Sequence, residues 1–266
     1  MREVAALVRA QWLVALTYRT RMLFSILGVL VGVVPVFIIS RALQEVAAPS
    51  LVGEGSQLFA FLVVGTVGLV FITSALVALP TAIGSGISTG TWESLLATPA
   101  RVWGLLAALS VYDLLWNVAK AAALLAAAAA LGARFEWGAL MLALGILALI
   151  VIAYLAIGVI AGALQLAFRS TTPLPRVVLI ASVFLGGVYY PTSAIPDGFR
   201  VLSEWIPLTY GLRALRRSLL EGWRLSQILP DLEMLLLFDA VLATVAALAF
   251  AAALRHARRA GTLSQY

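Results

Sequence analysis

Four polar side chains lie within long apolar stretches of the sequence, where ionisable groups are costly and are therefore candidates for function. Asp113, Asn117 and Lys120 are spaced i, i+4 and i+7, so a helix carries them on one face. Asp239 lies at a depth similar to that of Lys120 in another apolar stretch. We expect Lys120 to pair with Asp239 and hold two helices together; a Lys120–Asp113 pair, a proton or ion relay and a substrate contact are the open alternatives.

The residue types that most enzymes require are missing or misplaced. The chain has no cysteine and one histidine, His256, in its basic C-terminal stretch, so a metal site, a cysteine nucleophile and a Ser–His dyad are not expected. The single lysine, Lys120, is not part of the Gly-x-x-x-x-Gly-Lys-Ser/Thr loop that binds ATP phosphates. We therefore expect no catalytic residue, no metal and no cofactor in this chain.

The composition predicts an integral membrane protein. Of the 266 residues, 63% are hydrophobic and 11% are charged, and the mean hydropathy is +1.05. Soluble domains average about 45–50% apolar and about 25% charged residues. The net charge of +6 comes mainly from arginines at the edges of apolar stretches, which indicates membrane orientation rather than nucleic-acid binding. Because alternating strand patterns are missing, the expected fold class is all-α.

Six apolar stretches are long enough to be transmembrane helices. They cover about 22–40, 58–80, 102–131, 138–168, 175–192 and 232–254. Six spans place both termini on one side of the membrane, and the whole chain, 1–266, is then a single transmembrane domain. That side carries ten arginines and the opposite side seven, so we expect both termini in the cytoplasm.

Two segments outside the spans have helical patterns. Residues 1–21 place Trp12 and Tyr18 among arginines, which predicts an interfacial helix before the first span. In about 197–222, apolar residues recur at helical spacing on both sides of Pro207, followed by a glycine that can end a helix. We expect two short external helices there.

Polar groups that could line a substrate path are scattered over the second and fifth spans and the residues that follow the fifth. They are Thr66, Thr73, Ser74, Ser182, Tyr189 and Tyr190. A cavity bearing these groups among aliphatic side chains suits a lipid, a lipid-linked glycan or a hydrophobic drug. The tyrosines can alternatively belong to an aromatic belt at the membrane interface.

Two glycine pairs are spaced for close contact between helices. Gly28 with Gly32, and Gly158 with Gly162, are i, i+4 pairs within apolar stretches. Such pairs let helix backbones approach each other. Packing within one chain and packing across a dimer interface are equally compatible with the pattern.

A short polar stretch, STGTWESLLATPARVW (residues 88–103), separates the second and third spans. Thr91 can cap a helix that carries Glu93 in its first turn, and Pro99 ends it, so we expect a helix over about 91–98. Its apolar side consists of Trp92, Leu95 and Leu96. The arginine count places this helix in the cytoplasm, where it either docks a partner or lies on the lipid as an elbow.

Three motifs resemble those of ABC transporter type-2 permeases. GTWESLLATP (90–99) is similar to the family's Gly-Thr-Leu-Glu-x-Leu-Leu-x-Thr-Pro signature, with Trp92 in place of Leu. GGVYYPTSAIPDGF (186–199) and WIPLTYGLRALRRSLLEG (205–222) resemble the segment that follows the family's fifth span, with Ile195 in place of Leu. The order, the spacing and the six-span plan agree over essentially the whole chain.

The resemblance implies the permease subunit of an exporter in a bacterial or archaeal plasma membrane. It implies a dimer with a second permease copy, identical or a close paralogue. It also implies two cytoplasmic ABC ATPase subunits, which would hold the ATP and Mg²⁺. Residues 91–98 would be the coupling helix, and the residues that contact the ATPase would be Thr91, Trp92, Glu93, Leu95 and Leu96.

Two other classes fit the composition. An ion-coupled secondary transporter would use Asp113 and Lys120, although the internal repeat typical of that class is not detected. A structural membrane scaffold is the third possibility. Copurification with an ATPase distinguishes the exporter from both.

Overall fold

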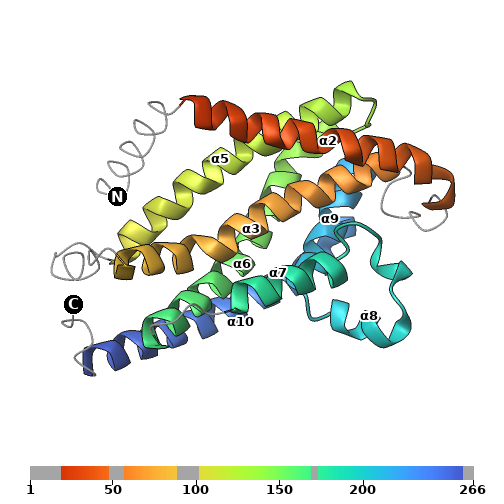
Figure 1. The fold of residues 1–266 in the computed structure, drawn as a ribbon. Coiled ribbons are helices and arrows are strands. Elements are labelled where there is room, and N and C mark those ends of the chain that lie inside the picture. Colours follow the sequence, from red (N-terminus) through yellow and green to blue (C-terminus); the bar gives the residue numbers. More distant parts are fainter. Residues whose placement is uncertain (1–18, 48–56, 89–101, 169–172, 260–266) are drawn as a thin grey trace.

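The computed structural model describes residues 19–47, 57–88, 102–168 and 173–259, and within these ranges all regular structure is helical (Figure 1). The helices are α2 (Arg19–Ala47), α3 (Leu58–Ser88), α5 (Val102–Ala130), η2 (Trp137–Ala139), α6 (Leu140–Phe168), α7 (Leu174–Leu185), η3 (Thr192–Ala194), α8 (Asp197–Ser203), α9 (Pro207–Glu221) and α10 (Leu225–Arg259). The expected all-α fold class is confirmed for the described residues. The predicted interfacial helix falls almost entirely on residues 1–18, outside the described ranges.

Five of the described helices are long and apolar enough to cross a membrane. They are α2, α3, α5, α6 and α10, and they match five of the six predicted spans. The remaining prediction, 175–192, differs, because α7 has 12 residues and ends at Leu185. At 1.5 Å per residue it is about 18 Å long, shorter than a bilayer core of about 30 Å. Gly187 adopts φ +76°, a left-handed conformation that breaks the helix.

The five long helices run between two ends of the molecule (Figure 1). At one end, which we call the Ser88 end, α3 finishes, α5 begins and α10 finishes. At the other, the Gly132 end, lie the turn between α5 and α6 and the short helix α8. The ends of the long described helices therefore alternate between two ends of an apolar bundle, as expected of a multi-pass membrane protein.

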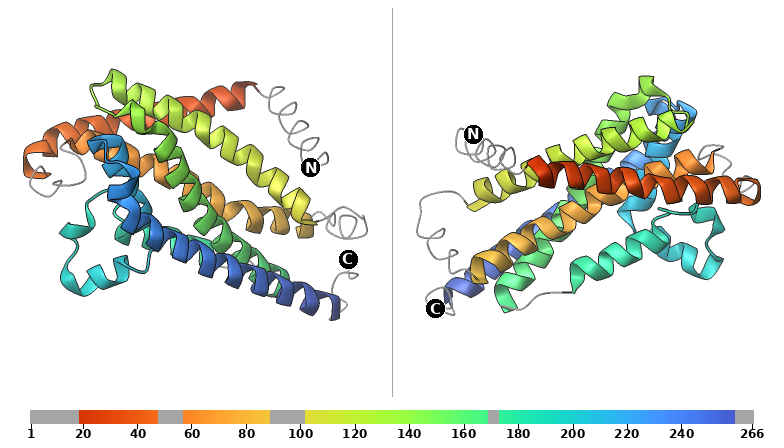
Figure 2. Two further views of the ribbon diagram at one scale, coloured as in Figure 1. Left: turned by 180° about the vertical axis from the view of Figure 1, so that it is seen from behind. Right: turned by 45° about the horizontal axis from the view of Figure 1, so that its top comes forward.

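Helix α3 is the centre of the bundle. In its apolar window 61% of the residues are buried, compared with 11% for α2 and 22% for α10. It packs against α2, α5, α6, α7 and α9, whereas α10 packs mainly along α6 and α9 (Figure 2). The largest cluster of buried side chains therefore forms around α3 and α6.

The two glycine pairs have different surroundings. A Cβ added at Gly158 would lie 2.7 Å from the carbonyl oxygen of Ala75, and one at Gly162 would lie 2.9 Å from Leu79 Cγ. This pair therefore serves close packing of α6 on α3 within one chain. At Gly28 and Gly32 in α2, an added Cβ would meet nothing within 4 Å.

Helices α8 and α9 occupy the segment in which two short helices are predicted. Pro207 is the first residue of α9, and Gly222, with φ +67°, caps its C-terminus while the Trp223 amide donates to the Arg217 carbonyl at 3.0 Å. The Glu136 amide donates to the carbonyl of Leu219 at 2.7 Å, so the turn before α6 is fastened to the end of α9. Helix α9 is thereby held against the bundle.

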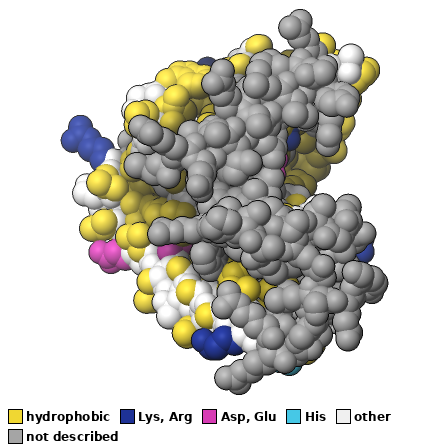
Figure 3. Space-filling view, turned by 90° about the vertical axis from the view of Figure 1, so that its left-hand side faces the viewer, with side chains coloured by type: hydrophobic (Ala, Val, Ile, Leu, Met, Phe, Trp, Pro, Cys, Tyr) yellow, Lys and Arg dark blue, Asp and Glu magenta, His cyan; other side chains and the backbone are white. Residues whose placement is uncertain are grey.

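The flanks of the bundle are apolar. Viewed from the Ser88 end, the described side chains along the perimeter are mostly hydrophobic (Figure 3). Large exposed side chains in α2 and α10 include Phe24, Val31, Leu237 and Leu248. Such surface is stable in contact with lipid and costly in water, as expected of membrane-spanning helices.

Candidate functional site

The predicted coupling residues lie outside the described part of the chain. Thr91, Trp92, Glu93, Leu95 and Leu96 all belong to residues 89–101. The structure describes the helices on either side, α3 up to Ser88 and α5 from Val102. The C-terminus of α3 and the N-terminus of α5 both lie at the Ser88 end (Figure 1).

The predicted pairing of Lys120 with Asp239 is wrong within this chain. Lys120 Nζ donates to Asn117 Oδ1 at 3.2 Å, and neither carboxylate oxygen of the buried Asp239 has a hydrogen-bond partner among the described residues. Asp113 is exposed. The reason lies in the packing: α5 contacts α2 and α3, whereas α10 contacts α6 and α9, so the two helices are not neighbours.

The threonines predicted to line a substrate path bond to their own helix. Thr66 Oγ1 donates to the Leu62 carbonyl at 2.8 Å, and Thr73 Oγ1 donates to the Leu69 carbonyl at 2.7 Å. Bonds of this kind satisfy a hydroxyl within an apolar span. Ser74 is half-buried on the same helix. Because the hydroxyls of Thr66 and Thr73 are satisfied within α3, they fit a nonpolar packing surface as well as a substrate path.

The other predicted path residues lie near the end of α7. Ser182 is buried, and its hydroxyl lies 2.5 Å from the Tyr154 hydroxyl of α6. The Tyr190 hydroxyl donates to the Phe184 carbonyl, and Tyr189 is 47% exposed. The Ser182–Tyr154 bond thus joins α7 to α6, and Tyr189 remains available at the surface.

The most strongly built polar site in the described chain is centred on Arg216 of α9, which the sequence analysis did not single out. Its side chain is 1% exposed. The guanidinium donates to the carbonyls of Gly187 at 2.8 Å, Val188 at 2.9 Å and Phe61 at 3.3 Å. Its central carbon lies 3.4 Å from the centroid of the Phe61 ring, a cation–π contact.

Arg216 connects three elements that are far apart in sequence. These are α9, the turn that follows α7, and the first part of α3. Gly65 makes room for the contact, because a Cβ there would lie 2.2 Å from the Val188 carbonyl oxygen and 2.9 Å from the guanidinium of Arg216. The site therefore fixes the turn after α7 to α3 at the Gly132 end.

The two other arginines of α9 share one acid. Arg213 Nη1 lies 3.2 Å from Asp231 Oδ1, and Arg217 Nη1 lies 2.9 Å from Asp231 Oδ2. Asp231 is buried in α10. The guanidinium of Arg213 also lies over Tyr210, and that of Arg217 over Trp223. Two cations on one carboxylate bind α9 to the first turns of α10.

A second set of polar contacts closes the corner between α8 and α9. Ser203 Oγ donates to the Leu185 carbonyl at 2.6 Å, and Thr209 Oγ1 donates to the Ser203 carbonyl at 2.8 Å. The Tyr210 hydroxyl donates to the Glu204 carbonyl at 3.2 Å. Burial, and then the negative charge of Glu204, raise the pKa of Tyr210 above its ordinary value, so this phenol stays protonated as a donor.

In the sequence of α9, Leu212, Leu215 and Leu219 form one stripe, and Arg213, Arg216 and Arg217 form another. The structure covers part of both stripes, because Leu212, Leu215 and Arg216 are all buried. The sequence contains two signals for this site. Arg213, Arg216 and Arg217 interrupt a helix with an apolar stripe, and the adjacent glycines at 186 and 187 predict a turn whose backbone carbonyls have no helical partner. That combination indicates cations that bind backbone acceptors.

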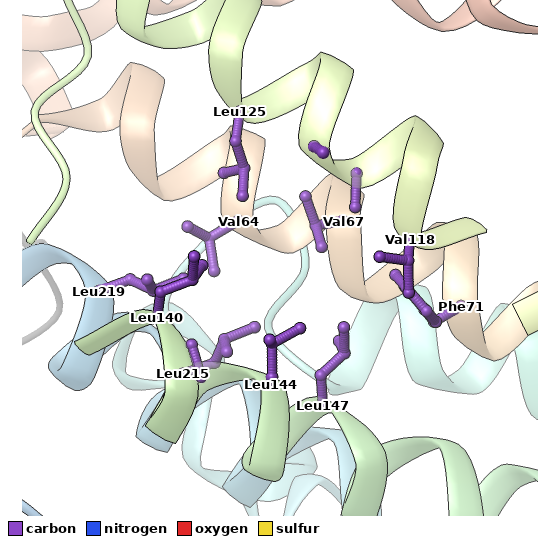
Figure 4. A pocket seen from close by; sticks show the side chains of 13 residues that line it. Val64, Val67, Phe71, Val118, Leu125, Leu140, Leu144, Leu147, Leu215 and Leu219 are labelled. Carbon is purple, nitrogen blue, oxygen red and sulfur yellow. The ribbon is translucent and has the colours of Figure 1, made fainter. Parts of the chain in front are cut away.

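An apolar cavity of about 160 Å³ lies between α3, α5, α6 and α9 (Figure 4). It is lined by Val64, Val67, Phe71, Val118, Ala121, Ala122, Leu125, Leu140, Ala143, Leu144, Leu147, Leu215 and Leu219. None of the six residues predicted for the substrate path lies in this lining.

Comparison with known proteins identifies relatives over most of the chain. The profile of the ABC-2 type transporter family matches residues 2–220. Nodulation protein J of Rhizobium leguminosarum bv. trifolii is 28% identical over 171 residues, which are 62% of this chain and 63% of that protein. Nodulation protein J of Sinorhizobium fredii is 28% identical over 135 residues, or 49% of this chain and 50% of that protein.

These relatives are matched over part of their length. The chain spans about half to two thirds of the curated relatives. The family match is broader, since it contains four of the five long apolar helices together with α7, α8 and nearly all of α9. A multi-pass helical bundle that matches one family over residues 2–220 leads to a single assignment: the chain belongs to the ABC-2 type transporter family.

Proposed function

We propose that this chain is the membrane-spanning permease of an ATP-driven exporter that moves a hydrophobic or amphipathic substrate outward. The substrate class is a lipid, a lipid-linked glycan or a drug. The observation that carries the proposal is the family match over residues 2–220, which includes the stretch between α3 and α5. This family assignment favours the exporter over an ion-coupled transporter that uses Asp113 and Lys120.

In this proposal the energy comes from two copies of a cytoplasmic ABC ATPase that bind ATP and Mg²⁺. The Ser88 end faces the cytoplasm together with both termini, and the Gly132 end faces outward. Residues 91–98 form the coupling helix. A movement of the ATPase reaches α3 and α5 through this stretch, since α3 ends at Ser88 before it and α5 begins at Val102 after it.

A second permease copy completes the transporter. Helix α2 supports this part of the proposal, because only 11% of its apolar window is buried and nothing within 4 Å would contact a Cβ at Gly28 or Gly32. A neighbouring helix can approach closely at such a glycine pair. The substrate path then lies between the copies, with Tyr189 and Tyr190 near its outer end.

The test is a single substitution in the coupling stretch. Leu95→Asp places a carboxylate in the apolar ridge and should weaken ATPase binding by about 2 kcal/mol or more, as loss of a central apolar anchor does. The measurements are copurification of the cognate ATPase in detergent and the ATPase rate in liposomes. Glu93→Arg should have the same effect.

The matched control is Leu202→Asp, because Leu202 is 50% exposed in α8 at the opposite end of the molecule. It should retain full ATPase binding. Full ATPase binding and full coupled transport by Leu95→Asp would show that the ATPase docks elsewhere.

A further inference from the structure

The apolar cavity beside α3 has an opening between two membrane-spanning helices. Helix α3 packs against both α5 and α6, whereas α5 and α6 diverge from the turn that joins them (Figure 2). In Figure 4 the side chains of Val118 and Leu125 point into the cavity from α5, and those of Leu144 and Leu147 from α6. Val64 and Val67 of α3 form its floor.

The residues that line the cavity divide by exposure. Val118 is 42% exposed and Leu144 is 42% exposed, and they lie on either side of the opening with Ala122. Val64 and Ala143 in the interior are nearly inaccessible. The cavity is therefore a pocket with a mouth on the surface between α5 and α6, and every residue lining it is apolar.

The position of the mouth determines what surrounds it. Residues 118–125 precede the end of α5 at Ala130 by 5 to 12 positions, which is about 8–18 Å along the helix axis. Both α5 and α6 contain membrane-spanning stretches. The mouth therefore opens to the hydrocarbon of the membrane half nearer the Gly132 end, where water is excluded.

The size of the pocket discriminates between occupants. The cavity has a volume of about 160 Å³. Apolar cavities of about 150 Å³ stay dry and take up small hydrocarbons such as benzene. The pocket therefore suits a narrow hydrocarbon chain of about six carbons better than water.

The turn between α5 and α6 can hold the polar end of the same molecule. Arg134 is exposed, and Trp137 is 53% exposed and stacks edge-on against Phe135. Tryptophan is enriched at the headgroup level of membranes, and a guanidinium binds phosphate. We use the word groove for the pocket together with its mouth between α5 and α6. We propose that this groove is a binding site for one phospholipid, with an acyl chain in the pocket and the phosphate near Arg134.

The test uses the permease alone in nanodiscs that contain a phospholipid with a photoactivatable diazirine in one acyl chain. Irradiation should label Val118, Ala122 and Leu144 more strongly than Val245 and Leu248, which are exposed on α10. Ala122→Phe fills the mouth and should reduce labelling of the groove about tenfold, the ratio that corresponds to about 1.4 kcal/mol of binding.

The matched control is Ala247→Phe on the exposed side of α10, which should leave labelling of the groove unchanged. If Ala122→Phe fails to fold as judged by size-exclusion chromatography, Val118→Trp replaces it. Equal labelling of the groove and of α10, unaffected by Ala122→Phe, would show bulk lipid only and overturn the proposal. No lipid label in the groove, together with a dimer that Ala122→Phe dissociates on size-exclusion chromatography, would identify a second copy as the occupant and would also overturn the proposal. Because no ATPase is present, the result is independent of the proposed transport function.

Discussion

Two ionisable side chains are buried in adjacent helices, and the fold treats them differently. Arg216 of α9 is 1% exposed and Asp239 of α10 is 7% exposed. Arg216 donates to three backbone carbonyls and lies over an aromatic ring. Neither carboxylate oxygen of Asp239 has a partner in the described residues. The two side chains are thus similarly buried, but only Arg216 has polar contacts that compensate for its removal from water.

The difference comes from the backbone around each residue. The turn after α7 breaks the helical hydrogen-bond pattern and leaves the carbonyls of Gly187 and Val188 available as acceptors. Asp239 needs donors, and α10 is a continuous helix in which the amides bond to the preceding turn. An irregular backbone can therefore hold a buried cation without a carboxylate, while a regular helix offers a buried acid nothing.

The largest expected effect is at Arg216. Arg216→Met leaves the carbonyls of Gly187, Val188 and Phe61 without their charged donor, and each buried unsatisfied group costs about 1–3 kcal/mol. We expect the free energy of unfolding to fall by at least about 3 kcal/mol, measured by thermal unfolding in detergent. Arg216→Lys should lose most of this stability, because an ammonium lacks the planar fork of a guanidinium.

The control for Arg216 is Arg224→Met, because Arg224 is exposed at the start of the next segment. That variant should unfold at the same temperature as the unaltered protein. Unchanged stability of Arg216→Met would mean that the three carbonyl contacts contribute nothing and that the two buried charges do not differ.

A smaller loss is expected at Gly65. In Gly65→Ala the new methyl group would lie 2.2 Å from the Val188 carbonyl oxygen, so the turn after α7 must move away from Arg216. Overpacking of this kind costs about 1–3 kcal/mol. Gly145→Ala in α6 is the matched control, because nothing lies within 4 Å of the added Cβ and alanine favours helix by about 1 kcal/mol relative to glycine. Equal melting temperatures of the two variants would contradict the tight packing at Gly65.

The smallest effect is expected at Asp239. Asp239→Leu removes a buried carboxyl group that has no hydrogen-bond partner among the described residues, so stability should stay the same or rise by about 1 kcal/mol. Asp231→Leu on the same helix is the sharp control, since it deprives Arg213 and Arg217 of their shared carboxylate and should destabilise the protein. Thermal unfolding of both variants should be followed by transport assays in liposomes.

The transport result decides what Asp239 does. A stable Asp239→Leu variant that no longer transports would assign this acid to function. Strong destabilisation by Asp239→Leu would instead reveal a stabilising partner for the carboxylate and remove the contrast with Arg216.

Local signals in the sequence were sufficient for much of the fold. Five long apolar stretches predict five of the long helices, because the length of a membrane span follows from the thickness of the bilayer. Pro207 and Gly222 predict the two ends of α9, since each restricts the backbone at its own position. The motifs in 90–99, 186–199 and 205–222 predict the family, which the profile match confirms.

The sequence does contain a signal for the early end of α7, but a prediction from hydropathy alone misses it. The apolar run continues to Tyr190, but the glycines at 186 and 187 end the helix at Leu185. Hydropathy measures preference for lipid, whereas the length of a helix depends on backbone conformation, and the two differ at a turn that remains buried.

The contacts of the buried charges were decided by the tertiary structure alone. Sequence gives the depth of Lys120 and Asp239 along their spans, but depth is one coordinate, and pairing also requires that the helices be neighbours. The packing of α5 on α2 and α3, and of α10 on α6 and α9, separates them. In the same way, Arg216 meets carbonyls 28, 29 and 155 positions away in the chain, which only the packing of α9 against α3 and the turn after α7 brings within hydrogen-bonding distance.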